Sequence, residues 1–324
     1  MGEGLQEIKI SEIAGVTFGQ AQDYTAMTGV SVALFSGKNT GGIDVSGGGP
    51  ASREAHLLSP YTDTKSLNAL VFAGGSAYGL GAADGVMKYL EERNRGFAVP
   101  GGVVPLVVQS DIFDLTLGNG RVRPDAKMAY EACLAAEAGA EPVSGSVGAG
   151  TGAAVGKLYG MGQSQKAGIA FHAVQLGELQ VGVMVVVNAF GDVFDWESGK
   201  QIRGLLDSKR QHLLSTEAEL YKQMIALQTG TNTTLAAIFT NAQFNEGEMN
   251  KIAAMARSGL ARAISPVNTM ADGDTIYAFS LGEVKADLNI VGLLAARVLS
   301  EGIKKAVTQE DFSEEAYRDL VLAH

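Results

Sequence analysis

The chain has 324 residues, of which 46% are hydrophobic and 19% charged, and its net charge is −10. This length admits one large domain or two ordinary ones, and the composition is that of a globular protein with a substantial core. The acidic balance, without any run of Lys or Arg, argues against a phosphate-binding basic face, so no nucleic-acid partner is expected. The single cysteine, Cys133, excludes a disulfide within the chain.

Neither a secretion signal nor a membrane span is predicted. Residues 1–14 have no basic start and no apolar centre. The longest strongly apolar run, 181–187, is far too short to cross a bilayer. We therefore expect a cytoplasmic protein without a membrane partner.

Strands and helices are predicted to alternate along the chain. Valine-rich or fully apolar runs predict strands over 28–36, 67–73, 103–108, 167–173, 180–188, 233–241 and 275–281. Helical spacing predicts helices over 77–93, 124–138 and 288–307, with another that follows Asn245. Asn245 and Glu248 form a capping box at the start of that helix. Such mixing favours a layered α/β or α+β fold.

The segment 199–231 has a different character from its surroundings. It contains the polar stretches 209–212 and 217–222 and shows no strand pattern. We interpret it as an exposed linker, helical or irregular, that leads into the strand beginning at Thr233.

Several familiar sites are excluded by their spacing. Residues 152–157 resemble a phosphate-binding loop, but Leu158 stands where a Ser or Thr is required. The run 74–79 resembles a nucleophile elbow whose second glycine arrives one residue late, and we interpret it as a strand-to-helix turn whose backbone lines a pocket. The four histidines have no metal-ligand spacing, so neither a metal nor another cofactor is expected.

A hydrolase without histidine or cysteine chemistry needs a nucleophile that carries its own base. The α-amine of an N-terminal Thr has a pKa of about 7.7–8.0, so a useful fraction is neutral and can accept the hydroxyl proton. Thr233 would become N-terminal if its hydroxyl attacked the carbonyl of Asn232 and the bond between them were cut. From the residues alone, 231–234 is more simply a strand start, and Thr231 and Thr234 remain alternative nucleophiles.

Six separated motifs carry a family resemblance. They occupy residues 43–50, 74–80, 112–115, 148–153, 232–234 and 272–275. These motifs follow one another in the order expected for the L-aminopeptidase/D-esterase (DmpA-like) family, which includes β-aminopeptidases and nylon-oligomer hydrolases. The chain resembles this family over nearly all of residues 10–305. The resemblance is closest to the nylon-oligomer hydrolase branch, because the nucleophile is Thr.

The resemblance implies an α+β fold, an αββα four-layer sandwich. It implies one catalytic domain, 1–324, which cleaves itself into 1–232 and 233–324, two chains that stay together in a homo-oligomer. The implied activity is hydrolysis of amide bonds in small peptides, amino-acid amides or ω-amino acid oligomers through an acyl-threonine intermediate.

The resemblance also implies a role for each matching residue. Thr233 attacks the amide carbonyl, and Asn188 donates an amide N–H to the developing oxyanion. Lys157 stabilises the deprotonated nucleophile. Asp272 and Asp274 orient the free amine and the hydroxyl, and the substrate is held by Gly75, Ser76, Ile112 and Phe113.

These roles have structural alternatives. Lys157 would otherwise pair with a carboxylate, Asn188 would cap a strand, and Asp272 and Asp274 would form an Asp-Gly turn.

Two other functions are compatible with the same residues. Ornithine acetyltransferases resemble this fold and also use a Thr released by self-cleavage, but they pass the acyl group to an amine. Their usual approach to the nucleophile is not evident in 230–232, which favours hydrolysis. The third function is a non-enzymatic protein that stays intact at residue 232.

Overall fold

Two β-sheets lie face to face in this computed structural model, which describes residues 4–63, 66–223, 232–309 and 311–322. The first sheet has the order β1-β12-β13-β16-β18-β4, with bounds Leu5–Ile8, Ile169–Leu176, Leu179–Asn188, Thr233–Ala242, Thr275–Val284 and Thr40–Val45. The second has the order β2-β3-β6-β9-β5, with bounds Val16–Asp23, Thr28–Phe35, Ala69–Ala73, Val107–Asp111 and Ala51–Arg53. Neighbouring strands are antiparallel except for the parallel pairs β16–β18 and β6–β9.

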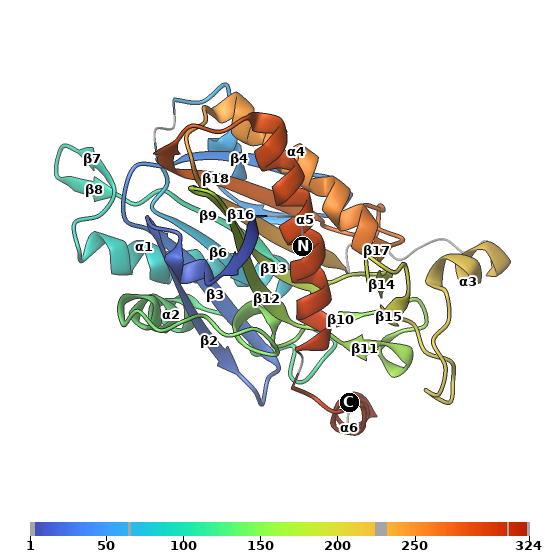
Figure 1. The fold of residues 1–324 in the computed structure, drawn as a ribbon. Helices are drawn as coiled ribbons and strands as arrows, with labels where there is room; N and C mark the ends of the chain where they lie inside the picture. Colours follow the sequence, from blue (N-terminus) through green and yellow to red (C-terminus); the bar gives the residue numbers. More distant parts are fainter. Residues whose placement is uncertain (1–3, 64–65, 224–231, 310, 323–324) are drawn as a thin grey trace.

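Helices cover the outer face of each sheet (Figure 1). On the first sheet they are α4 (Glu246–Ala263) and α5 (Leu288–Thr308), and on the second α1 (Ala83–Glu91) and α2 (Ala126–Glu137). The αββα sandwich and the α+β class are therefore confirmed. The capping box of Asn245 and Glu248 also forms at the start of α4.

Alternation along the strands builds the separate layers. In β16, Leu235 and Phe239 pack between the two sheets, whereas Ala236 and Ile238 pack toward α4 and α5. Successive side chains of a strand point to opposite faces, so a strand with both faces covered has an almost continuous apolar sequence. The space between the sheets contains a group of contacting aromatic rings among aliphatic side chains, and the rings of Phe239 and Phe279 stack with their centroids 5.9 Å apart.

The remaining elements are short. Two-stranded ribbons are formed by β7 with β8 and by β10 with β11, with bounds Phe97–Val99, Gly102–Val104, Ala154–Val155 and Gln165–Lys166. A three-stranded sheet has the order β15-β14-β17, with bounds Gln201–Arg203, Asp192–Phe194 and Ile264–Ser265. The 3₁₀ helices span Ile10–Glu12, Ala55–Leu58, Ser76–Ala82, Gly148–Gly150 and Met161–Gln163, and two more α-helices are α3 (Thr216–Gln223) and α6 (Glu314–Leu322).

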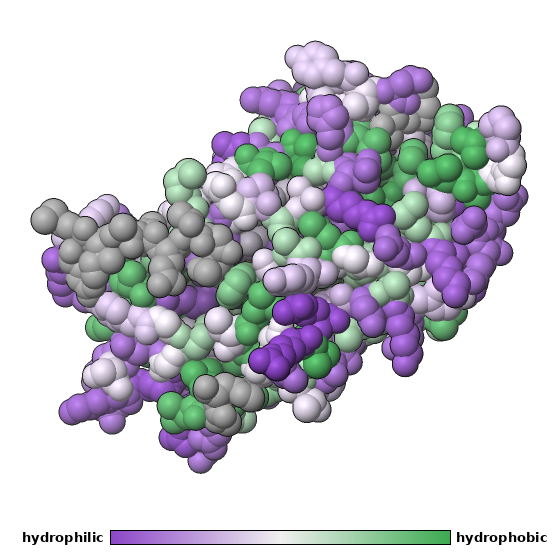
Figure 2. Space-filling model, turned by 180° about the vertical axis from the view of Figure 1, so that it is seen from behind, coloured by the Kyte–Doolittle hydropathy of each residue, from purple (hydrophilic) through white to green (hydrophobic). Residues whose placement is uncertain are grey.

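Two segments differ from the sequence prediction. The strand expected over 103–108 is divided, because Pro105 has no N–H to donate and separates β8 from β9. The preceding hairpin β7–β8 projects from the body (Figure 1), and hydrophobic surface gathers at that end of the molecule in the opposite view (Figure 2). The helix expected over 77–93 begins as a 3₁₀ helix and becomes α-helical only at Ala83.

The prediction that 199–231 holds no strand is wrong. The segment contributes β15, and Leu205 is fully buried behind it. The buried Asp192 carboxylate accepts the N–H groups of Leu205 (2.8 Å) and Thr216 (2.7 Å), which anchors this part of the segment to β14. Residues 224–231 of the predicted linker lie outside the described residues.

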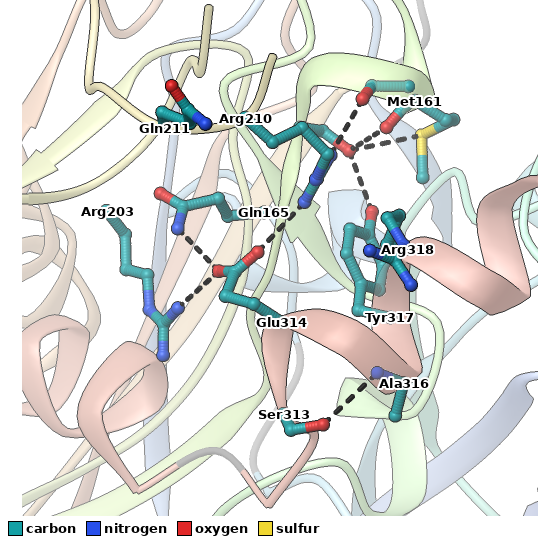
Figure 3. A network of polar contacts seen from close by, with 12 residues as sticks. Met161, Gln165, Arg203, Arg210, Gln211, Ser313, Glu314, Ala316, Tyr317 and Arg318 are labelled. Atoms are coloured by element: carbon teal, nitrogen blue, oxygen red, sulfur yellow. Dashed lines mark hydrogen bonds and ion pairs between the residues drawn. The ribbon is translucent and has the colours of Figure 1, made fainter.

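The C-terminal helix α6 is held by a polar network (Figure 3). The carboxylate of Glu314 accepts hydrogen bonds from three side chains, those of Gln165 (2.5 Å), Arg203 (2.8 Å) and Arg210 (2.9 Å). One turn further on, Tyr317 is fully buried, and its hydroxyl lies 2.7 Å from that of Ser164. Helix α6 is thereby joined to the segment around 203–210. No helix in the described part of the chain is both long enough and apolar enough to pass through a membrane.

Candidate active site

The predicted nucleophile begins a central strand. Thr233 is the first residue of β16, and Asn188, the last residue of β13, lies directly opposite it in the antiparallel register. On the other side, Asn232 forms a parallel bridge with Asp272. Thr233 is buried, and its hydroxyl donates a hydrogen bond to the carbonyl oxygen of Asn232, the carbonyl that it would attack.

A backbone donor reaches the same carbonyl. The N–H of Gly273 lies 2.8 Å from the Asn232 oxygen. A Cβ at Gly273 would stand only 2.8 Å from the Thr233 hydroxyl oxygen and 2.8 Å from the carbonyl oxygen of Gly49. Gly273 therefore has to be glycine for the chain to pass this close. Sequence reasoning missed it, because the motif 272–275 was interpreted through its two carboxylates.

The two carboxylates hold backbone around Thr233. Asp274 accepts the N–H of Thr234 at 2.6 Å, one residue beyond the predicted nucleophile. Asp272 accepts both the N–H (3.1 Å) and the hydroxyl (2.5 Å) of Thr269. Burial raises the pKa of Asp272, and burial together with the charge of Asp272 raises the pKa of Asp274 to about 7. Near neutral pH this pair can therefore hold a proton.

Lys157 and Asn188 form one unit. The Lys157 ammonium donates to both the backbone carbonyl and the side-chain oxygen of Asn188, each at 2.9 Å. Burial lowers the pKa of Lys157 to about 7, although Asp272 and other nearby carboxylates oppose the shift. The side-chain nitrogen of Asn188 donates to the carbonyl of Phe113 at 2.9 Å. In the uncut chain, the predicted oxyanion donor thus already has an acceptor.

The predicted substrate-binding turn is built on Asp114. The Asp114 carboxylate accepts the N–H of Gly75 at 2.7 Å and the hydroxyl of Thr28 at 2.6 Å. Gly75 and Ser76 both have positive φ, +83° and +52°, and the N–H of Ser76 donates to the carbonyl of Ile112. The Ile112 side chain is fully buried between the sheets, so it packs in the core. Burial raises the pKa of Asp114 to about 6, a perturbation that the sequence does not reveal.

The arrangement brings all five predicted catalytic residues to one end of the central strands. Thr233 and Asn188 are paired by register, Lys157 binds Asn188, and Asp274 binds the residue after Thr233. A nucleophile, a basic nitrogen with a pKa near neutrality and a backbone donor at a carbonyl oxygen are parts that acyl transfer requires. Among the described residues, no group of three His, Cys, Asp or Glu side chains is placed to hold a metal ion.

The chain is similar to several known proteins. Residues 9–320 match the family described as Peptidase family S58. An uncharacterized aminopeptidase of Mycobacterium tuberculosis (strain ATCC 25618 / H37Rv) is 40% identical over 262 residues, which cover 79% of this chain and 74% of that protein. The 6-aminohexanoate-oligomer endohydrolase of Agromyces sp. (strain KY5R) is 29% identical over 316 residues, which cover 91% and 84%.

Solved structures show the same fold. The L-aminopeptidase D-Ala-esterase/amidase of Ochrobactrum anthropi, described as a variant of the Ntn hydrolase fold, aligns with a TM-score of 0.71 at 15% identity, covering 97% of this chain and 93% of that one. A β-aminopeptidase of Burkholderia sp. aligns with a TM-score of 0.67 at 18% identity, covering 97% and 93%. The chain therefore belongs to peptidase family S58, and it is a hydrolase of peptide or amide bonds.

Proposed function

We propose that this hydrolase cuts itself between Asn232 and Thr233 and then uses the freed Thr233 as its nucleophile. The observation that carries the proposal is the hydroxyl of Thr233 resting against the carbonyl oxygen of Asn232, which also accepts the N–H of Gly273. The proposed substrates are small peptides, amino-acid amides and ω-amino acid oligomers. Relatives named as an aminopeptidase and as a 6-aminohexanoate-oligomer endohydrolase support this class.

Self-cleavage takes place in two steps. The Thr233 oxygen bonds to the Asn232 carbonyl carbon, its proton passes to neutral Lys157, and the oxygen of the tetrahedral intermediate receives the N–H of Gly273. The bond to the Thr233 nitrogen then breaks, and this nitrogen takes the proton back from Lys157. The product is an ester between Asn232 and the Thr233 oxygen. Water opens the ester, leaving a carboxylate on Asn232 and a free amine and hydroxyl on Thr233.

Substrate hydrolysis repeats this chemistry on an external carbonyl. The α-amine of Thr233 accepts the hydroxyl proton as the oxygen attacks, and it gives the proton to the departing amine. Loss of residue 232 from the strand start frees the space that the Asn232 carbonyl occupied, and the substrate carbonyl takes its place. Water then releases the acyl group from Thr233. If an amine reached the acyl-threonine first, the reaction would be acyl transfer.

The test compares three proteins on one amide substrate. Wild type, Thr233→Ala and Thr233→Ser are assayed with β-alanine p-nitroanilide and with the linear dimer of 6-aminohexanoate. We expect hydrolysis by wild type and by the Ser variant, and none by the Ala variant. Hydrolysis by Thr233→Ala at the wild-type rate would overturn the proposal. Hydroxylamine added as an acceptor separates the alternative, because a transferase would form mainly hydroxamate.

We further propose that the two chains stay together and associate as a homo-oligomer. Strands β16 and β18 would belong to the small chain, yet they lie between β13 and β4 of the large chain. Separation would break the sheet on both sides. The projecting β7–β8 hairpin, with Phe97, Val99 and Val104 exposed, offers apolar surface for association. Light scattering coupled to gel filtration measures the mass of the assembly, and a mass equal to one chain pair would contradict the oligomer.

A further inference from the structure

A cavity borders the predicted substrate-binding turn, since a Cβ placed at Gly75 would lie 3.3 Å from the Cβ of Arg123. Its volume is about 840 Å³, and Tyr78, Leu115, Asn119, Arg121 and Arg123 are among the residues that line it. None of these side chains has a role in the self-cleavage or in the acyl transfer described above.

Two short segments connect this cavity to the site. Tyr78 follows the Gly75–Ser76 turn, and Leu115 lies two residues after Phe113, whose carbonyl accepts the side-chain nitrogen of Asn188. Two residues of extended chain reach at most about 7 Å. A substrate whose scissile carbonyl takes the place of the Asn232 carbonyl lies at Thr233, which faces Asn188 in the register of β13 with β16. Such a substrate would thus reach the cavity with its next one or two residues.

The cavity is lined by two positive charges. The Arg123 guanidinium lies 3.8 Å from the centre of the Tyr78 ring, and its Nε donates to the carbonyl of Gly120 at 3.0 Å, so its position is fixed from two sides. Arg121 is exposed at the rim, on a loop closed by its own N–H to the Asn119 side chain at 3.1 Å. Two arginines that line the same cavity are a local exception in a chain of net charge −10.

Acidic groups stand close by but border another space. Asp23, Asp125 and Glu131 line a neighbouring cavity that also includes Arg123 and Lys127, and Glu131 lies 3.9 Å from the Lys127 ammonium. The Asp125 carboxylate is engaged as the N-cap of α2, where it accepts the N–H of Met128, and Asp23 accepts two N–H groups of its own turn. The larger cavity is therefore lined by the two arginines without an intervening carboxylate among its lining residues.

We propose that this cavity binds the free carboxylate at the leaving end of the substrate, through Arg121 and Arg123. The proposal rests on the hydrolysis proposed above and names its substrate class, short peptides or ω-amino acid oligomers with an unblocked C-terminus. When the cut releases the first residue or two, the terminal carboxylate of such a substrate lies on the leaving side. Guanidinium groups match a carboxylate in geometry as well as in charge, since each offers a planar pair of N–H donors.

The experiment measures the ratio of kcat/KM for a free-acid dipeptide to kcat/KM for its C-terminal amide. The value of kcat/KM is determined for one dipeptide as its free acid and as its C-terminal amide, with wild type, Arg121→Gln, Arg123→Gln and the double variant. Two partly exposed charge pairs correspond to a preference of about 10-fold for the free acid in wild type. The double variant should lower the ratio to about 1, mainly through KM, and 0.5 M NaCl should lower it in wild type.

The matched control is Arg262→Gln, which removes the same charge from an exposed position in the last turn of α4. It should keep the wild-type ratio. Arg123 also packs on Tyr78, so its replacement could prevent folding. In that case the test relies on Arg121→Gln alone, because Arg121 is exposed, and this variant should lower the ratio at least 2-fold. An unchanged ratio in Arg121→Gln and in the double variant would overturn the carboxylate site while leaving the Thr233 mechanism intact. Failure of wild type to hydrolyse either dipeptide would instead overturn the hydrolysis on which this proposal rests.

Discussion

Replacing Gly273 by alanine would place a methyl group against the predicted nucleophile. The new Cβ would lie 2.8 Å from the Thr233 hydroxyl oxygen and 2.8 Å from the Gly49 carbonyl oxygen, whereas ordinary contact begins near 3.4 Å. The two neighbours belong to different segments, one at the start of β16 and one after β4, so both contacts have to be relieved at once. We expect the strand start at Thr233 and the turn carrying the Gly273 N–H to separate by about half an ångström.

The size of the effect follows from what this separation disturbs. The 2.8 Å hydrogen bond from Gly273 to the Asn232 oxygen would lengthen, and this oxygen carries the charge of the tetrahedral intermediate. Loss of one such donor costs about 10²–10³ in rate, and a misplacement of about 1 Å costs about 10². We therefore predict that Gly273→Ala cleaves itself about 10²- to 10³-fold more slowly than wild type.

A time course of self-cleavage measures this directly. The protein is made by cell-free synthesis, synthesis is stopped, and the fraction of uncut chain is followed on denaturing gels. Gly247→Ala is the matched control, because a Cβ there meets nothing closer than 3.4 Å at the start of α4. If Gly273→Ala is folded by circular dichroism and cleaves itself within 3-fold of the control, the role assigned to the Gly273 N–H is wrong.

Three further predictions concern charged groups, and the stability measurements use the uncut Thr233→Ala background. Because neutral Lys157 is the proposed base and its pKa is about 7, the rate of self-cleavage should fall about tenfold for each pH unit below 7 and level off above pH 8. In the same gel time course, Lys157→Met should lose this pH dependence. The pKa of Asp274 is raised to about 7, so the contribution of this group to the free energy of unfolding is present at low pH and is lost as the pH rises toward 7. In Asp274→Asn, the free energy of unfolding measured with urea should therefore change less between pH 4 and pH 7. Glu314→Gln should lower the free energy of unfolding by about 1 kcal/mol, because it breaks the ion pairs with Arg203 and Arg210. The control Glu315→Gln loses only an exposed pair with Arg318 at 3.9 Å and should leave the urea midpoint unchanged.

The sequence predicts the interior strands well, because their pattern is strong. Residues 235–239 are apolar on both faces, and the structure places them in β16 between two other strands. The short or half-exposed strands escaped prediction, since β1 and β5 have too few apolar residues to show a period. Pro105, which has no N–H, indicates that a strand over 103–108 would be interrupted. The valines on both sides of Pro105 nevertheless favour one continuous strand.

The candidate site could be predicted only as residue types, not as an arrangement. That Asn188 lies opposite Thr233 depends on the register of β13 with β16, a long-range pairing that no local pattern fixes. The resemblance to a family supplied the residues, and the structure supplied their contacts. Gly273 acts through its backbone and Asp114 through burial, and neither property leaves a mark in the sequence that distinguishes it from an ordinary turn.

The central claim is tested most directly by the intact mass of the purified protein under denaturing conditions, measured beside Thr233→Ala. We predict two species in wild type, residues 1–232 and the 92 residues of 233–324, and one uncut species in the variant. Thr234→Ala should be cut like wild type, because its hydroxyl is not the nucleophile. A single species of 324 residues from folded wild type would contradict the account, and so would two species from Thr233→Ala.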